Sequence, residues 1–202
     1  ASSRDEAVNL AEKIGFPVVM KVVSEDIVHK FDVRGVVLDI RGRDQAAAAW
    51  DAIHENVRRL RPDARIDGVY LQKMVAGGQE VILGVKRDPS FGSVIMFGLG
   101  GIFVEVFRDV SFRVAPVGPR AAREMIHEIR ACPLLTGARG KNPRDLDSIV
   151  ECIQRLSRLA VEIPEIQELD INPLIVQDQG AGSFVADARI LLTSTHEGDL
   201  HP

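Results

Sequence analysis

Three strand-like segments separated by short, glycine-bearing turns most constrain the fold of this chain. They read VYLQKMV (69–75), QEVILGVKRD (79–88) and SVIMFGLGGIFVEVF (93–107). Turns this short join antiparallel neighbours into hairpins, whereas parallel strands need a crossover connection of a dozen or more residues. The sequence therefore predicts antiparallel pairing in the middle of the chain.

Helical and strand patterns alternate on both sides of these segments, which predicts an α+β fold. The expected helices are 4–14, ending at Gly15, then 44–60 with Asp44 as its N-cap, 119–130 and 145–161. The expected additional strands are 17–24, 36–40, 167–177 and 183–190. Residues 193–202 are expected to form a disordered tail.

Composition and charge limit the possible partners. The 202 residues, 46% of them hydrophobic, suffice for one large domain or two small ones. Basic and acidic residues are interspersed, with a net charge of -4, and no apolar run approaches the roughly 20 residues that span a bilayer. We therefore expect neither nucleic acid nor a membrane as a partner. Cys132 and Cys152 have no metal-site spacing, so we expect free thiols in a reducing compartment, the cytoplasm.

The stretch QELDINPLIVQ (167–177) places oxygen-bearing side chains at every second position of an expected strand. Glu168, Asp170 and Asn172 share one face, and the apolar residues between them share the other. Asp170 or Asn172, together with Asp187 from the next strand, could bind Mg²⁺, which is usually held by one or two carboxylates plus phosphates. An ordinary turn at Asn172 and a strand-end charge at Asp187 would explain the pattern equally well.

Charged and glycine-rich positions in other strands suggest a phosphate ligand. Lys21 is the only charge in PVVMKVVS, and it must reach water, pair, or meet an anion; an edge-strand lysine is an equal alternative. The cluster GLGGIFVE (98–105) could bind an anion through backbone amides, although a flexible hairpin is the simpler reading. Arg113, in VSFRVAP, adds a second cation. Glu80 by itself is only a solvated strand-opening glutamate.

Taken together, these segments resemble the ATP-grasp domain of NDP-forming acyl-CoA synthetases, the relatives of succinyl-CoA ligase beta subunits. The resemblance runs from Ala7 to Leu192 and rests on ordered motifs: GFPVVMKVVS, IVHKFDVRGVV, LQKMVAGGQEVILGVKRDPSFGSVIMFGLGGIFVEVFRDVSFRVAP, PLLTGARG and ELDINPLIV. It implies an ATP-grasp fold of two α+β subdomains, at 1–73 and 74–192. We expect the N-terminal part of that fold to lie outside the chain.

The resemblance also implies nucleotide-binding roles. Lys21 would contact the phosphates of ATP or ADP, and Glu80 would bind the ribose end. The hinge LQKMV, with Lys73 and Val75, would meet the adenine mainly through its backbone. Lys73 stands where the family usually has an acidic residue, so we expect altered affinity rather than lost binding.

The remaining implied groups concern the moving phosphate and the metal ion. The phosphate-side groups are Arg113 and the loop 98–101, with Gly100 and Gly101. The Mg²⁺ ligands are Asn172 and Asp187, supported by Asp170. Cations, metal and positioning are the means by which proteins catalyse phosphoryl transfer.

His29 has the most consequential implied role. A histidine in a polar loop is usually just solvated, but the resemblance makes His29 the carrier that takes up the phosphoryl group as a covalent intermediate. The family segment reads HKSD or HKTD followed by two glycines, whereas this chain reads HKFDVRGV. Phe31 and Arg34 therefore predict a bulkier and less flexible loop.

The implied reaction is acid + CoA + ATP = acyl-CoA + ADP + phosphate, and it requires more than this chain. The sequence contains no G-x-G-x-x-G CoA-binding half and no ligase half. We expect an alpha half, in cis or in trans, to bring the carboxylic acid and CoA, and we expect an oligomer. The alternative is a regulatory ATP-grasp module fused to an acyltransferase, with decayed catalysis, which Phe31 and Arg34 permit.

Overall fold

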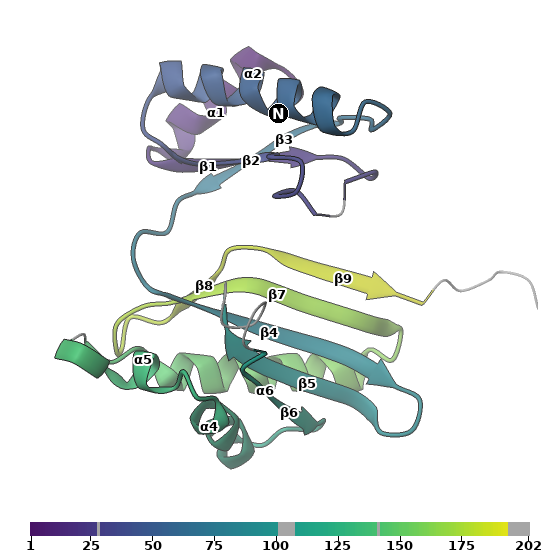
Figure 1. Ribbon diagram of the computed structural model, residues 1–202, viewed down its shortest axis with the longest axis vertical. Coiled ribbons are helices and arrows are strands. Elements are labelled where there is room, and N and C mark those ends of the chain that lie inside the picture. Colours follow the sequence, from purple (N-terminus) through teal and green to yellow (C-terminus); the bar gives the residue numbers. More distant parts are fainter. Residues whose placement is uncertain (28, 101–107, 141, 194–202) are drawn as a thin grey trace, which may run out of the picture. The chain divides into compact units, whose positions relative to one another are not determined.

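The computed structural model describes residues 1–27, 29–100, 108–140 and 142–193, and it divides into two compact units. Unit 1 is Ala1–Met74 and unit 2 is Val75–Pro202. The chain passes from one to the other directly after β3 (Figure 1). Most of the expected tail, and the part of segment 93–107 that follows Gly100, lie outside the described residues.

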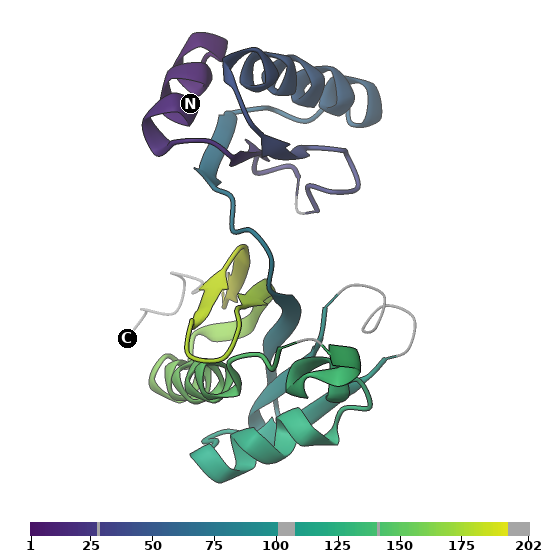
Figure 2. The same cartoon turned by 90° about the vertical axis from the view of Figure 1, so that its left-hand side faces the viewer.

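Unit 1 is a three-stranded antiparallel sheet with two helices on one face (Figures 1 and 2). Its elements are α1 (Arg4–Ile14), β1 (Val18–Val23), β2 (Val36–Ile40), α2 (Arg43–Leu60) and β3 (Gly68–Lys73). The order β2-β1-β3 makes β1 the central strand. Val18, Met20 and Val22 are fully buried in the core of this unit, so alternate residues of β1 point to the other face.

The two helices of unit 1 begin differently. Helix α1 has Ser3 as its N-cap, accepting from the backbone N–H of Glu6, and ends at Gly15 with φ 84°, as expected for a glycine. Helix α2 begins one residue before the expected start, and its N-cap is Gly42, which has no side chain to donate or accept. The prediction of Asp44 as N-cap was therefore wrong. Asp44 lies in the first turn, where its negative charge still favours the helix N-terminus.

Unit 2 is a six-stranded antiparallel sheet. Its strands are β4 (Gln79–Asp88), β5 (Gly92–Leu99), β6 (Val110–Val114), β7 (Ile166–Val176), β8 (Ser183–Val185) and β9 (Ala188–Leu192). The order is β6-β5-β4-β7-β8, and β9 also pairs with β7. The predicted hairpin is confirmed for β4 and β5, but β3 does not pair with β4. The chain changes sheets at Gly77 and Gly78, both with positive φ.

Helices cover one face of the unit 2 sheet (Figure 1). They are α4 (Pro119–Glu128), α5 (Pro133–Thr136), the 3-10 helix η1 (Ala138–Gly140) and α6 (Leu146–Glu162). The apolar residues that recur at helical spacing in α6, Ile149, Ile153, Leu156 and Ala160, are buried, and they pack with the inward residues of β4 and β5 in one core. Within the described ranges, no helix has the length and apolar character needed to cross a bilayer.

Strand β7 continues through Asn172 and Pro173 because its pairing with β4 shifts there. Val81 is opposite Leu174, but Leu83 is opposite Ile171, so β7 contains one residue more than β4 over this interval. Such a bulge reverses the side-chain alternation. Inward residues are odd-numbered before the bulge, at Leu169, and even-numbered after it, at Leu174.

Asp145 ties the start of α6 to the turn before β8. Its Oδ1 accepts from the N–H of Ser148 at 3.0 Å, and its Oδ2 accepts from the N–H of Gly182 at 2.9 Å. The side chain is only 8% exposed. These backbone donors, Ser148 first, hold the pKa of Asp145 below its ordinary value, because they stabilise the charged form.

We predict that Asp145→Asn lowers the free energy of unfolding by about 2 kcal/mol at neutral pH. Because the folded-state pKa is depressed, the contribution is present above the unfolded pKa, about 3.9, and disappears as pH falls through the folded value. Urea titrations from neutral to strongly acid pH should therefore show the difference between wild type and variant shrinking. Asp63→Asn, at an exposed turn position of unit 1, is the control and should change stability by less than about 0.5 kcal/mol. A pH-independent difference would contradict the role of the charge.

Candidate functional site

Lys21 lies in the middle of the central strand of unit 1, on the face opposite the helices. Its cross-strand neighbours are Val36 on β2 and Tyr70 on β3. The side chain is 8% exposed. The alternative of an edge-strand lysine is wrong, since β1 is flanked on both sides. A lysine ammonium so little exposed is expensive unless other groups stabilise it.

The His29 loop connects β1 to β2 and is closed by backbone hydrogen bonds. The carbonyl of His29 accepts from Asp32, and the carbonyl of Lys30 accepts from Gly35 at 2.8 Å. The carbonyl of Gly35 in turn accepts from the N–H of Val22 on β1 at 2.7 Å. The side chain of His29 is exposed. The loop therefore presents the imidazole to solvent from a base fixed to the central strand.

The residues that depart from the family pattern occupy unusual positions in this loop. Phe31 is 68% exposed. Arg34 has φ 51°, in the left-handed region that glycine adopts without strain. Gly35 is constrained by packing rather than by its backbone conformation, because an added Cβ would lie 2.5 Å from Cγ1 of Val22. The structure thus places an arginine where the backbone favours glycine.

Lys73, at the end of β3, reaches back to the end of α1. Its ammonium donates to the carbonyls of Gly15 at 2.5 Å and Phe16 at 2.8 Å. A cation near the C-terminus of a helix satisfies terminal carbonyls and the helix dipole. The side chain of Lys73 is thus engaged within unit 1. Val75 is half-buried in the segment after β3.

Glu80 and Gly100 lie side by side at one end of unit 2's sheet. The N–H of Gly100 donates to the carbonyl of Glu80 at 2.9 Å. A Cβ on Gly100 would lie 3.1 Å from Cβ of Glu80, so glycine permits this approach. Glu80 is exposed, and its alternation with the inward Val81 places it on the helix-free face. Gly101 lies outside the described residues.

Asn172 and Asp187 are brought together by the bulge in β7. The N–H of Asn172 donates to the carbonyl of Asp187 at 3.1 Å. Residues directly opposite each other on antiparallel segments carry their side chains on the same face. Asp170 lies two residues away and accepts from Nε of Arg189 at 2.9 Å. The three predicted metal-site residues are therefore neighbours on the helix-free face.

These residues fit a partial Mg²⁺ site. Magnesium takes oxygen ligands and usually retains waters and phosphate oxygens beside one or two carboxylates. The carboxylate of Asp187 and the amide oxygen of Asn172 supply that kind of ligand. Among the described residues, no cluster of three or more His, Cys, Asp or Glu side chains could hold a metal ion. The remaining ligands would have to come from water and from a bound nucleotide.

Arg189 is a neighbour of this site that the sequence analysis missed. Its guanidinium pairs with Asp170 and approaches Glu168 at 4.0 Å, and Glu168 also pairs with Lys86 at 3.2 Å. The sequence could have indicated Arg189, because its i, i+2 spacing from Asp187 places both side chains on one face of the expected strand.

Arg113 does not join these groups. Its guanidinium forms two hydrogen bonds with the carboxylate of Glu128 on α4, one of them at 2.9 Å, and holds the pKa of Glu128 below its ordinary value. Its neighbour in sequence, Phe112, is exposed on the other face. The structure therefore places Arg113 on the helix-covered face of the sheet.

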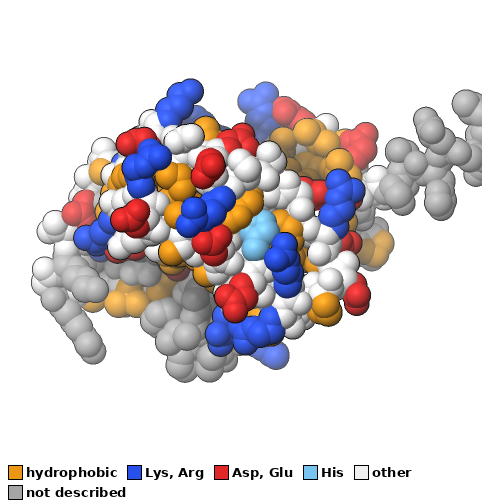
Figure 3. Space-filling model, turned by 90° about the horizontal axis from the view of Figure 1, so that it is seen from above, with side chains coloured by type: hydrophobic (Ala, Val, Ile, Leu, Met, Phe, Trp, Pro, Cys, Tyr) orange, Lys and Arg blue, Asp and Glu red, His pale blue; other side chains and the backbone are white. Residues whose placement is uncertain are grey.

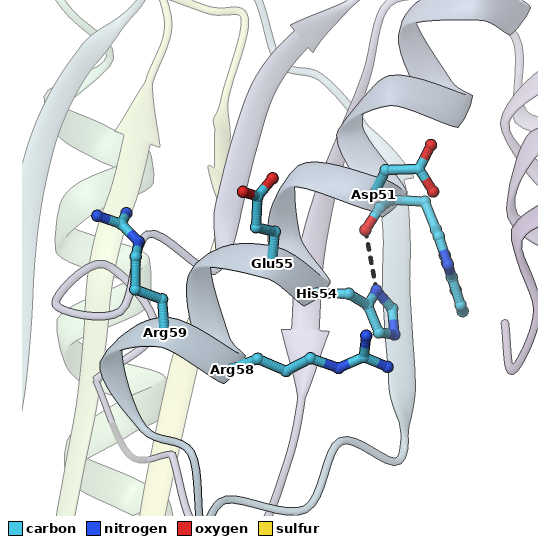
Figure 4. A pocket seen from close by; sticks show the side chains of 6 residues that line it. Asp51, His54, Glu55, Arg58 and Arg59 are labelled. Carbon is cyan, nitrogen blue, oxygen red and sulfur yellow. Dashed lines mark hydrogen bonds between the residues drawn. The ribbon is translucent and has the colours of Figure 1, made fainter.

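A shallow cavity on the outer face of α2 contains none of the predicted residues. It is lined by Trp50, Asp51, His54, Glu55, Arg58 and Arg59 (Figure 4). The rings of Trp50 and His54 stack at 4.2 Å between centroids, and Nδ1 of His54 lies 2.9 Å from the carbonyl of Trp50. Basic and acidic side chains intermix on this side of unit 1 (Figure 3). The charged side chains that line the cavity are not predominantly of one sign, so their charge does not indicate a binding site.

A family model described as an ATP-grasp domain matches residues 1–192. The beta subunit of acetate–CoA ligase [ADP-forming] II from Pyrococcus furiosus is 48% identical over 193 residues, which are 95% of this chain and 82% of that subunit. Acetate–CoA ligase [ADP-forming] I from Archaeoglobus fulgidus is 50% identical, but the match covers 95% of this chain and only 28% of that protein.

Solved structures of a Ca. Korarchaeum cryptofilum protein, dinucleotide forming acetyl-coenzyme A synthetase 1, are also similar. One, in complex with coenzyme A, Ca-AMPCP and HgCl+, matches with TM-score 0.91 and 49% identity over 96% of this chain and 83% of that one. Another, with coenzyme A and Mg-AMPPCP, matches with TM-score 0.80 and 45% identity over 95% and 83%. It is described as having its phosphohistidine segment pointing towards the nucleotide binding site.

We predict that Arg34→Gly changes the free energy of unfolding by less than about 0.5 kcal/mol, because relief of the positive φ offsets the greater freedom of glycine in the unfolded chain. Glu55→Gly, at an exposed position inside α2, should cost about 1 kcal/mol. Urea unfolding of both variants makes the comparison. An equal loss in the two variants would show that Arg34 is unstrained.

Proposed function

The chain belongs to the ATP-grasp domain family, and we propose that within it the chain is the nucleotide-binding and phosphoryl-transferring part of an ADP-forming acid–CoA ligase. The family and the α+β ATP-grasp fold expected from the sequence are both confirmed. The observation that carries the proposal is the 48% identity over 82% of a beta subunit of such a ligase.

The reaction proposed for the whole enzyme is acid + CoA + ATP = acyl-CoA + ADP + phosphate. In the step assigned to this chain, a ring nitrogen of His29 attacks the γ-phosphorus of ATP, the bond to the β–γ bridging oxygen breaks, and ADP leaves. The phosphoryl group then passes to the carboxylate of the acid. The exposed imidazole on a loop closed at its base supports this carrier role.

The roles toward the nucleotide are proposed residue by residue. Lys21, almost fully buried on the helix-free face, neutralises phosphate charge, and the backbone of 71–75 meets the adenine. Glu80 binds the ribose end, and the contact of Gly100 with Glu80 brings the glycine segment beside it. We propose no direct role for Arg113, since it lies on the helix-covered face of the sheet and pairs there with Glu128 of α4.

Mg²⁺ is proposed to bind at Asn172 and Asp187 and to neutralise phosphate charge when it is bound. Asp170 is proposed as a supporting carboxylate. Its ion pair with Arg189 would hold the carboxylate beside the metal ligands rather than on the ion itself.

The rest of the enzyme is proposed to be a CoA-binding and ligase half. The chain spans only 28% of the Archaeoglobus relative, which leaves room for such a half on one polypeptide, whereas the Pyrococcus relative is named as a separate subunit. That half would bring the carboxylic acid and CoA, in an oligomeric assembly. Cys132 and Cys152 are free thiols in the structure, which agrees with the cytoplasm as the proposed compartment.

A regulatory module with decayed catalysis is the second candidate. The strained backbone of Arg34 and the exposed Phe31 favour it, since both alter the loop that carries His29. The presence of His29 itself favours retained catalysis, and a phosphorylation assay separates the two candidates.

We predict that Asp187→Ala lowers the affinity for ATP about tenfold in the presence of magnesium, or about 1.4 kcal/mol, and removes its magnesium dependence. The change deletes a metal ligand without deleting core volume. Calorimetric titration with and without Mg²⁺ measures it, and Glu165→Ala, which removes an exposed carboxylate of the same unit, is the control. Unchanged Mg-ATP affinity would exclude the site.

We predict that ATP and magnesium label His29 with a phosphate that is labile in acid and stable in base, as a phosphoramidate is. The assay uses the chain assembled with its CoA-binding half, because in the reverse direction the phosphoryl group enters from the acyl side. His29→Ala should abolish both the label and turnover.

Two other histidines serve as matched controls for that variant. His54 stacks on Trp50 and His127 lies near Cys132, so neither belongs to the loop. His54→Ala and His127→Ala should keep the label. Continued turnover of the His29→Ala enzyme would end the carrier assignment.

A further inference from the structure

Two residues that line one cavity of unit 2 carry the buried side-chain polar atoms that find no hydrogen-bond partner in the described part of the chain. The cavity, of about 650 Å³, is lined by Asn142, Arg144, Gln177 and Asp178 together with small residues, among them Gly77, Gly78 and Gly140. The two atoms are Nε of Arg144 and Nε2 of Gln177. A buried donor without an acceptor costs about 1 to 3 kcal/mol. Two such donors on neighbouring lining residues indicate that an acceptor binds beside them.

The hydrogen bonds around the guanidinium of Arg144 leave its Nε without an acceptor. Its Nη1 donates to Oδ1 of Asp178, while Asn142 donates to the second oxygen, Oδ2, at 3.2 Å. The side chain of Arg144 is only 16% exposed. Asp178 therefore uses both oxygens and neutralises the arginine, but leaves Nε without an acceptor.

Gln177 is fixed in its place by its backbone and by a glycine. Its N–H donates to the carbonyl of Gly182, and its carbonyl accepts from the N–H of Asp145. An added Cβ on Gly78 would lie 2.9 Å from Nε2 of Gln177. Gly78 also has φ 87°, so both space and backbone require glycine beside the amide.

We propose that this cavity is an oxyanion site, in which Arg144 and Gln177 donate to the oxygens of a phosphate or carboxylate group. Both unpartnered atoms found among the described residues are donors, which favours an anion over a cation, and a guanidinium matches two oxygens of such a group. None of its residues belongs to the proposed nucleotide or metal groups. The site also gives a role to PLLTGARG (133–140), which ends at the cavity.

The test titrates the chain with inorganic phosphate and, separately, with acetate, and follows the amide NMR signals of Gly77 and Gly78 together with thermal unfolding. Gln177→Glu places a carboxylate near the unpartnered Nε of Arg144. We expect this variant to unfold at a higher temperature in anion-free buffer and to bind either anion at least about tenfold more weakly. Gln179→Glu makes the same change at an exposed position outside the lining and should behave as wild type.

The two anions distinguish the sources of the ligand, since tighter binding of phosphate indicates a phosphate group and tighter binding of acetate a carboxylate. A wild-type chain that responds to neither, or a Gln177→Glu variant that still binds as wild type, overturns the proposal and leaves a buried water as the acceptor. The result is independent of the proposed function, because His29 labelling should persist in Gln177→Glu. If His29 of the wild-type protein is not labelled, that result contradicts only the proposed phosphoryl transfer and not the oxyanion site.

Discussion

The extra residue in β7 determines the arrangement of unit 2. Because the pairing with β4 shifts at Asn172, the strand keeps its inward apolar residues on both sides of the bulge. A regular strand would have turned either Leu169 or Leu174 out of the core, at a cost of about 1.5 to 3 kcal/mol for one leucine. The bulge also places Asn172 opposite Asp187 on the helix-free face. The same irregularity therefore preserves the core and assembles the proposed metal ligands.

Close backbone approach is the second constraint, and it recurs beside three of the groups to which we assign a function. Gly35 has no room for a Cβ against β1 at the base of the His29 loop, Gly100 has little room against Glu80, and Gly78 has none against Gln177. At these three positions any side chain would displace a strand or a functional group. These glycines are thus favoured by packing, and Gly78 by its positive φ as well, which explains why a glycine-rich stretch is not necessarily flexible.

Sequence reasoning was reliable where one local signal decided the outcome. Periodicity and caps placed α1 and α6, and the glycine turn placed the β4–β5 hairpin. It failed where the outcome depended on distant partners. The pairing of β3 with β1 rather than β4 follows from which sheet β3 completes. The segment 183–190 divides into β8 and β9 because the two strands pair with β7 on opposite sides of its bulge. Lys21 was correctly noted as an unusual charge, but its position in a central strand required the sheet order.

The face on which a charged strand residue lies decides its chemistry more than its residue type. Arg113 and Arg87 both sit on strands of one sheet, and both reach helix groups: Glu128 for the first, and the carbonyl of Ala160 near the end of α6 for the second. Such arginines join helices to the sheet. Glu80, by contrast, lies on the helix-free face, where a ligand meets no competing helix. Since one position along a strand reverses the face, a bulge or register shift changes whether the same residue stabilises the fold or remains available to bind a nucleotide.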